Sequence, residues 1–108
     1  MTDSAGYIAA LEQELLTLKA VHEALLAETA ALTDGDTDNL GIATTSKNAA
    51  LEAHQAALNQ RPAGDLSEEA NAALKALQDR LASLAGECQE LNRRNGALIS
   101  KLSDRTTA

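Results

Sequence analysis

The chain is predicted to be all-α, with three long helices in an antiparallel up-down-up bundle or coiled coil and a long C-terminal helix. Composition is the first observation behind this fold class. Ala (23) and Leu (18) dominate the 108 residues, whereas Ile occurs three times, Val and Tyr once each, and Phe and Trp not at all. Ala and Leu are good helix formers, and the residues that fill strands are scarce. Because Ala buries little area, narrow leucine seams between long helices suit this chain better than a wide core.

Spacing is the second observation. Apolar residues recur at intervals of three and four in three segments, and two breaks separate these segments. We expect helices over about residues 4–33, 37–60 and 67–103, within a single helical-bundle domain, 1–108. The connections between them are short, which makes successive helices antiparallel.

The first helix carries the clearest heptad pattern, along one stripe of mainly apolar residues. This stripe is formed by Ile8, Leu11, Leu15, Leu18, His22, Leu25, Thr29 and Leu32. Ser4 or Asp3 can cap the start of the helix. At its end, Gly35 suits the left-handed position that commonly follows the last helical residue.

The second helix has the weakest pattern. Its seam contains three polar positions and consists of Leu40, Thr44, Lys47, Leu51, His54 and Leu58. Gly41 and the Thr, Ser and Asn residues near it lower helix propensity, so we expect the first two turns to be irregular or mobile. The stretch from Arg61 to Asp65 should close the helix, because Pro62 disfavours helix at the residue before it and Gly64 follows.

The third helix should begin at an N-cap, Ser67, and run to about Ser103. Its seam is nearly unbroken and consists of Leu74, Leu77, Leu81, Leu84, Cys88, Leu91, Asn95, Leu98 and Leu102. At 1.5 Å per residue this helix would be about 55 Å long, against about 36 Å for the second. The region around Asn95 should therefore overhang the second helix, and exposed apolar surface of this kind usually marks a partner site.

The pair Asn95-Gly96 is unusual inside a leucine seam, and three interpretations stay open. Gly96 can end the helix, although Leu98 and Leu102 continue the heptad without a phase shift. Asn95 can be a buried asparagine that fixes helix register. Alternatively, Gly96 lets a partner backbone approach closely while the amides of Asn92 and Asn95 bind it. A hairpin turn is excluded, because no strands flank the pair.

Charge is unevenly distributed along the chain. The net charge is −7, but residues 1–90 contribute −10 and residues 91–108 contribute +3. An acidic body argues against non-specific binding of nucleic acid, which requires a basic surface. The basic residues near the C-terminus also suit the negative end of a helix dipole, so they need no partner to explain them.

The sequence contains no sign of a membrane or secretory protein. No apolar run approaches membrane-spanning length, and no basic-plus-apolar leader follows Met1. The single cysteine, Cys88, cannot form an internal disulfide. We therefore expect a soluble, cytoplasmic protein with no membrane insertion.

Catalytic chemistry has little support in the sequence. His22 and His54 fall on the seams of different helices and could face one another, but no other ligand is suitably spaced around them. Cys88 lies on a seam and is expected to act as a small core residue. The only acidic Gly turn, Asp34-Gly35-Asp36, would repel phosphate. We expect no catalytic residue, no metal site and no cofactor, and hence no enzyme.

One stretch has a recognisable family pattern. Leu91-Asn92-x-x-Asn95-Gly96-x-Leu98-Ile99 resembles the C-terminal helix motif of the FlgN family of flagellar export chaperones. A looser similarity runs upstream, through Leu15-Leu16, Leu25-Leu26, the acidic turn from Asp34 to Asp38 before Leu40, and Lys47, Leu51 and Arg61. The C-terminal motif is fairly specific, whereas leucine spacings alone would fit many helical proteins.

The resemblance implies a non-enzymatic chaperone of flagellar type III secretion. Members of that family bind the C-terminal helical segments of hook-associated (hook–filament junction) proteins of the FlgK and FlgL type, and deliver them to the export gate of the export apparatus. The C-terminal helix carries the client contact. In this sequence that contact maps onto Leu91, Asn92, Asn95, Gly96, Leu98, Ile99 and Leu102.

A second function class stays open beside the chaperone. The heptads could instead make the chain a structural or adaptor protein that self-associates as a homo-oligomer, with Asn95 setting the register between chains. The chaperone hypothesis has its own physical basis. A client helix would dock against anchors at heptad spacing, which the C-terminal seam provides at Leu91, Asn95, Leu98 and Leu102.

Overall fold

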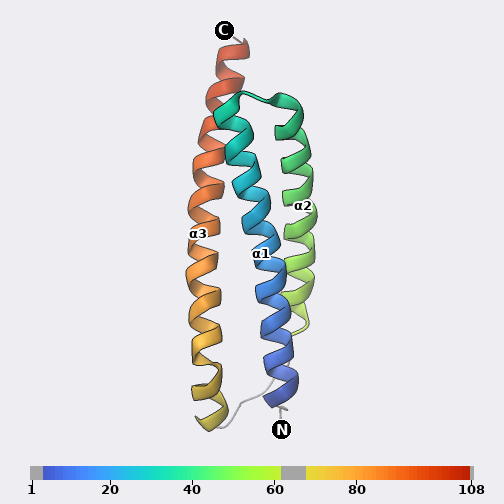
Figure 1. Cartoon of the computed structure of the whole chain (residues 1–108), viewed down its shortest axis with the longest axis vertical. Coiled ribbons are helices and arrows are strands. Elements are labelled where there is room, and N and C mark those ends of the chain that lie inside the picture. The colour runs from blue at the N-terminus through green and yellow to red at the C-terminus, as the bar shows by residue number, and fades with distance from the viewer. Residues whose placement is uncertain (1–3, 62–67, 108) are drawn as a thin grey trace.

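The computed structural model describes residues 4–61 and 68–107, which form three helices. These are α1 (Ser4–Asp34), α2 (Thr37–Asn59) and α3 (Glu68–Thr107), and no strand occurs among the described residues. The predicted all-α fold is confirmed. The α-carbons fill an elongated volume of 59 × 19 × 19 Å, and α3 runs beyond the predicted end at residue 103 (Figure 1).

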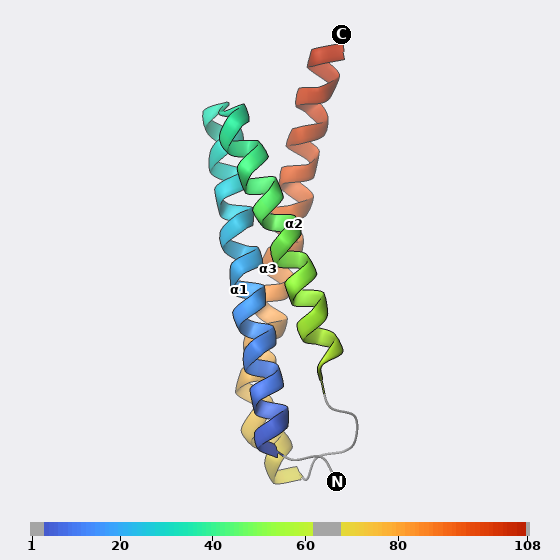
Figure 2. The same ribbon diagram turned by 90° about the vertical axis from the view of Figure 1, so that its right-hand side faces the viewer.

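The central element is α1, which packs against both other helices and lies between them in Figure 1. Within the described residues, no α-carbon of α2 comes within 8 Å of an α-carbon of α3. The three helices therefore form two separate pairs that share α1. Figure 2 shows α2 and α3 inclined to one another, with the end of α3 extending beyond the α1–α2 turn.

The pair α1–α3 is held by a leucine core. The buried residues of this core repeat along both helices and are Leu11, Leu15, Leu18, Val21, Leu25, Leu74, Leu81 and Cys88. In α3 the buried positions recur every seventh residue, as expected when one stripe of a helix faces its neighbour. The sequence expectation that Cys88 is a small core residue is confirmed.

The pair α1–α2 is held mainly by alanines. Ala43 and Ala57 are the buried residues of α2, and Ala24 and Ala31 are buried on α1. The leucines predicted to form the seam of α2 are not buried: Leu51 is 43% exposed and Leu58 is 37% exposed. The predicted seam is therefore only partly correct. Thr44, Lys47 and His54 are hydrogen-bonded to α1. At Leu51 and Leu58 the prediction is off by one residue, because the preceding alanines, Ala50 and Ala57, are the more buried positions.

The turn between α1 and α2 is built from local capping interactions. Gly35 has φ +67°, as predicted for the residue after a helix end. The amide of Gly35 donates to the carbonyl of Leu32 at 3.4 Å, and that of Asp36 donates to Ala31 at 2.9 Å. Asp36 is also the N-cap of α2, and its side chain accepts a hydrogen bond from the amide of Asn39 at 3.1 Å.

The expectation of an irregular start to α2 is wrong. The helix is continuous from Thr37, although Gly41 and several polar residues lie in its first turns. Two kinds of interaction compensate for their low helix propensity. The Asp36 cap satisfies an amide at the start of the helix, and Thr44 and Lys47 are anchored to a buried carboxylate of α1.

The overhang of α3 begins later than predicted. Asn95 is 1% exposed and hydrogen-bonded to α1, so the region around it is not uncovered. The exposed leucines near the end of α3 are Leu98 and Leu102. Among the described residues, no helix combines the length and apolar content that a membrane-spanning segment needs.

Candidate functional site

The C-terminal half of α3 contains all seven residues singled out in the sequence, and Asn95 is the best enclosed of them. Its Nδ2 donates hydrogen bonds to the carbonyl of Leu25 at 3.0 Å and to Oε1 of Glu28 at 3.1 Å. Its Oδ1 accepts from the hydroxyl of Thr29 at 2.9 Å. Since α3 continues through Gly96, the interpretation of Gly96 as a helix end is wrong. Asn95 sits where the buried-asparagine interpretation put it, within one chain.

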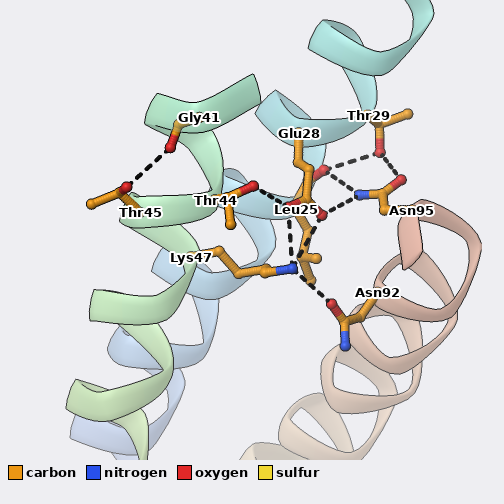
Figure 3. Close-up of polar contacts among 9 residues, drawn as sticks. All are labelled: Leu25, Glu28, Thr29, Gly41, Thr44, Thr45, Lys47, Asn92 and Asn95. Carbon is orange, nitrogen blue, oxygen red and sulfur yellow. Dashed lines mark hydrogen bonds and ion pairs between the residues drawn. The ribbon is translucent and has the colours of Figure 1, made fainter. Parts of the chain in front are cut away.

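Glu28 of α1 is the centre of a polar layer that joins all three helices (Figure 3). Its carboxylate is fully buried and accepts hydrogen bonds from Thr44 at 2.9 Å and from Asn95 at 3.1 Å. Lys47 Nζ lies 3.1 Å from Glu28 Oε2 and also donates to Asn92 Oδ1 at 3.1 Å. Through the hydrogen bond from Lys47 to Asn92, this layer links a side chain of α2 directly to a side chain of α3.

The polar layer determines how the helices can slide past one another. A buried charge without its partners is destabilising by several kcal/mol, roughly 3–5 kcal/mol when one partner of an ion pair is removed. Among the described residues, every buried side-chain nitrogen and oxygen has a hydrogen-bond partner. A shift of α2 or α3 by one residue would break these contacts, so the layer fixes the register of both helices on α1.

A second buried carboxylate anchors the other end of α2. Glu14 is buried on α1, two heptads before Glu28, and accepts two hydrogen bonds from Arg61, of which the one from Nε is 2.9 Å long. Arg61 follows Lys47 by the same interval. Sequence reasoning missed both glutamates. Their only signal was the matching spacing of the two acids on α1 and of the two bases, one on α2 and one just after it.

The other predicted site residues present a surface. Asn92, Gly96, Leu98 and Leu102 are exposed, whereas Leu91 and Ile99 are half-buried. Leu98 is 43% exposed and Leu102 is 42% exposed. A Cβ atom at Gly96 would meet nothing within 4 Å. The glycine therefore serves no close contact inside the chain and leaves a flat place on α3, two residues before Leu98.

Charged side chains surround this surface. Arg93 forms an ion pair with Glu90 at 2.7 Å on the exposed side of α3, and this guanidinium holds the pKa of the Glu90 carboxyl below its usual value. Arg94 and Lys101 are exposed as well. The apolar end of α3 is thus bordered by cations, in contrast to the acidic body of the molecule.

The two histidines do not form a site together. His22 Nε2 lies 3.5 Å from Glu87 Oε2 of α3, whereas His54 Nδ1 lies 2.9 Å from the hydroxyl of Thr17 on α1. They contact different helices, so the possibility that they face one another is wrong. No group of three metal-binding side chains occurs within residues that the structure describes. Burial raises the pKa of the Cys88 thiol, which makes this cysteine a poor nucleophile.

Comparison with protein families gives one match. The family described as FlgN protein matches residues 1–108, which is the whole chain. Among curated proteins and among solved structures no match is found. The family match covers the same C-terminal stretch that carries the exposed leucines.

Proposed function

Because the chain belongs to the FlgN family of flagellar export chaperones, we propose that its clients are hook-associated proteins of the FlgK or FlgL type. In this proposal the chain binds their C-terminal helical segments in the cytoplasm and delivers them to the export gate. It acts by covering apolar surface and not by catalysing a reaction.

The observation that carries this proposal is the exposed apolar row near the end of α3. Leu98 and Leu102 lie one turn apart on this row, and both keep more than two fifths of their surface exposed. An amphipathic client helix would bury these side chains in its own apolar face. Asn95 keeps this part of α3 in position, because its side-chain amide is hydrogen-bonded to α1.

The test is the binding of a purified FlgK-type or FlgL-type protein to variants of this chain. Leu98→Asp places a charge on the proposed contact, and we expect at least a tenfold loss of affinity in a calorimetric titration. Ile42→Asp is the matched control, because Ile42 is an exposed apolar residue on α2. Both variants should keep their helical circular dichroism. Normal client binding by Leu98→Asp would refute the C-terminal site.

Self-association through the heptads, the second function class, has lost part of its physical basis. That hypothesis used Asn95 to set the register between chains, but both donors of its amide bond to α1 of the same chain. Sedimentation over a range of concentrations separates the two functions. A tight homo-oligomer that binds no hook-associated protein would favour self-association over the chaperone.

A further inference from the structure

A groove runs along the side of the molecule where α2 and α3 stay apart. It consists of two adjoining hollows of about 240 and 510 Å³ that share Leu18, His54 and Ala85. The floor is apolar and belongs to α1, with Leu18, Val21 and Leu25. We call this feature the α2/α3 groove. These floor residues also belong to the α1–α3 core and are only 1–5% exposed.

The two walls of the α2/α3 groove carry different side chains, and together they can accommodate a helix. On α2 the wall is formed by Leu51 and Leu58, which are the exposed seam leucines. On α3 it is formed by Leu81, Ala82, Ala85 and Cys88 together with three amide side chains, Gln78, Gln89 and Asn92. Three helices with an apolar trough between two of them leave the fourth position of a helical bundle empty.

The charges that line the α2/α3 groove are neutralised within the chain. Glu14 is paired with Arg61, and Lys47 is paired with Glu28. The remaining polar lining groups are uncharged amides and His54, which lies within hydrogen-bond distance of Thr17. An occupant that inserted a charged side chain would bury it without a counterion, which is strongly unfavourable. The inserted face must therefore be apolar and uncharged.

The ends of the α2/α3 groove set the length of an occupant. Arg61 lies at one end, and the hydrogen bond from Lys47 to Asn92 bridges the other. Arg61 is the fourteenth residue after Lys47 and lies just past the end of α2, so at a helical rise this interval corresponds to about 21 Å or four turns. A segment of this size is a helix of ordinary length, so one client helix would fill the groove.

A second copy of the chain fits the α2/α3 groove less well than a client does. The exposed leucines of α3 are Leu98 and Leu102, but Arg94 and Lys101 lie four residues before and three residues after Leu98, on the same side of the helix. Inserting this side of α3 into the groove of another copy would bury those charges. The charge requirement therefore favours a partner helix with an uninterrupted apolar face.

We propose that the α2/α3 groove binds an amphipathic helix of the exported client, about four turns long, whose inserted face carries no charge. Chaperone and client then form a four-helix bundle in which the client helix lies between α2 and α3, opposite α1. This inference rests on the proposed function and adds a second contact to the end of α3. Asn92 belongs to both contacts, because it lies at the bridged end of the groove and in the C-terminal motif.

The test changes each wall separately and measures binding of a purified FlgK-type or FlgL-type protein by calorimetric titration. Leu51→Asp alters the α2 wall, and Ile42→Asp is its control on an exposed part of α2 outside the groove. Ala82→Arg fills the groove from the α3 wall, and Ala76→Arg is its control, because Ala76 is exposed and absent from the lining. All four positions are exposed, so the fold should tolerate them.

We expect Leu51→Asp and Ala82→Arg each to weaken client binding at least tenfold, and the two controls to change it less than about twofold. Normal binding by both wall variants, together with loss of binding in Leu98→Asp, overturns the groove proposal and leaves the proposed function intact. If the unmodified chain binds neither client type, the proposed function itself is wrong. A dimer that Leu51→Asp dissociates, with unchanged client binding, would assign the groove to a second copy.

Discussion

The two helices that flank α1 are attached to it in different ways. In α3, leucines and a cysteine at heptad spacing fill the contact. In α2 the contact is made by alanines and by two ion pairs to buried carboxylates of α1, one from Lys47 and one from Arg61 just after the helix. The leucine contact uses the apolar residues of α3 until its last turns. The alanine contact leaves the leucines of α2 at the edge of a groove. What a helix uses for its own packing thus determines which apolar side chains remain for a partner.

The largest expected effect comes from breaking an ion pair that holds α2. Lys47→Met leaves the fully buried carboxylate of Glu28 without its cation, and we expect the free energy of unfolding to fall by about 3–5 kcal/mol in urea denaturation. Lys75→Met is the control, because Lys75 forms an exposed pair with Asp79 at 3.5 Å and should change stability by about 0–1 kcal/mol.

The double variant Lys47→Met/Glu28→Met sharpens this comparison. It removes the buried charge together with its partner and should recover much of the stability that the single variant loses. Equal stability of Lys47→Met and the unmodified chain would show that the polar layer does not hold α2 to α1.

An intermediate effect is expected from widening the alanine contact. Ala43→Leu adds a branched side chain at a position that is only 5% exposed, and overpacking of this kind should lower stability by about 1–3 kcal/mol. Ala49→Leu is the matched control at an exposed position of α2 and should be nearly neutral. Thermal unfolding of the two variants checks the difference. A stable Ala43→Leu variant would mean that α2 needs no close approach.

The smallest effects come from one substitution made at two glycines, and they should have opposite signs. Gly35→Ala forces a side chain into a left-handed conformation at the α1–α2 turn and should destabilise the chain by about 1 kcal/mol. Gly96→Ala improves helix propensity in open space on α3 and should stabilise it by about 0.5–1 kcal/mol. Urea midpoints measure both, and a destabilised Gly96→Ala would reveal a packing role for that glycine.

Sequence reasoning found the helices and missed part of their packing. The apolar periodicity, the cap at Gly35 and the end of α1 depend on neighbours in sequence and were readable from it. The packing face of α2 was not, because Ala43, Ala50 and Ala57 repeat with the same heptad spacing as the seam one residue later. Both stripes are regular, and only contact with α1 distinguishes them.

For the candidate site, too, the sequence identified the residues but not their contacts. The motif drew attention to Asn95 and Gly96 because both are unusual in a helix, but it could not distinguish their roles. In the folded chain Asn95 faces α1 and Gly96 faces open space. The exposed leucines of the motif stay the predicted client contact, and the experiments above decide their role.

The sequence by itself determined three helices, the left-handed glycine after the first helix and a C-terminal apolar row, because these follow from propensities and spacings within single segments. Only the tertiary structure decided that alanines bind α2 to α1, that Glu28 collects side chains from three helices, and that a groove remains between α2 and α3. Each of these depends on which of two regular stripes meets a neighbouring helix. That choice is made by packing and buried charge between distant segments, which no single segment encodes.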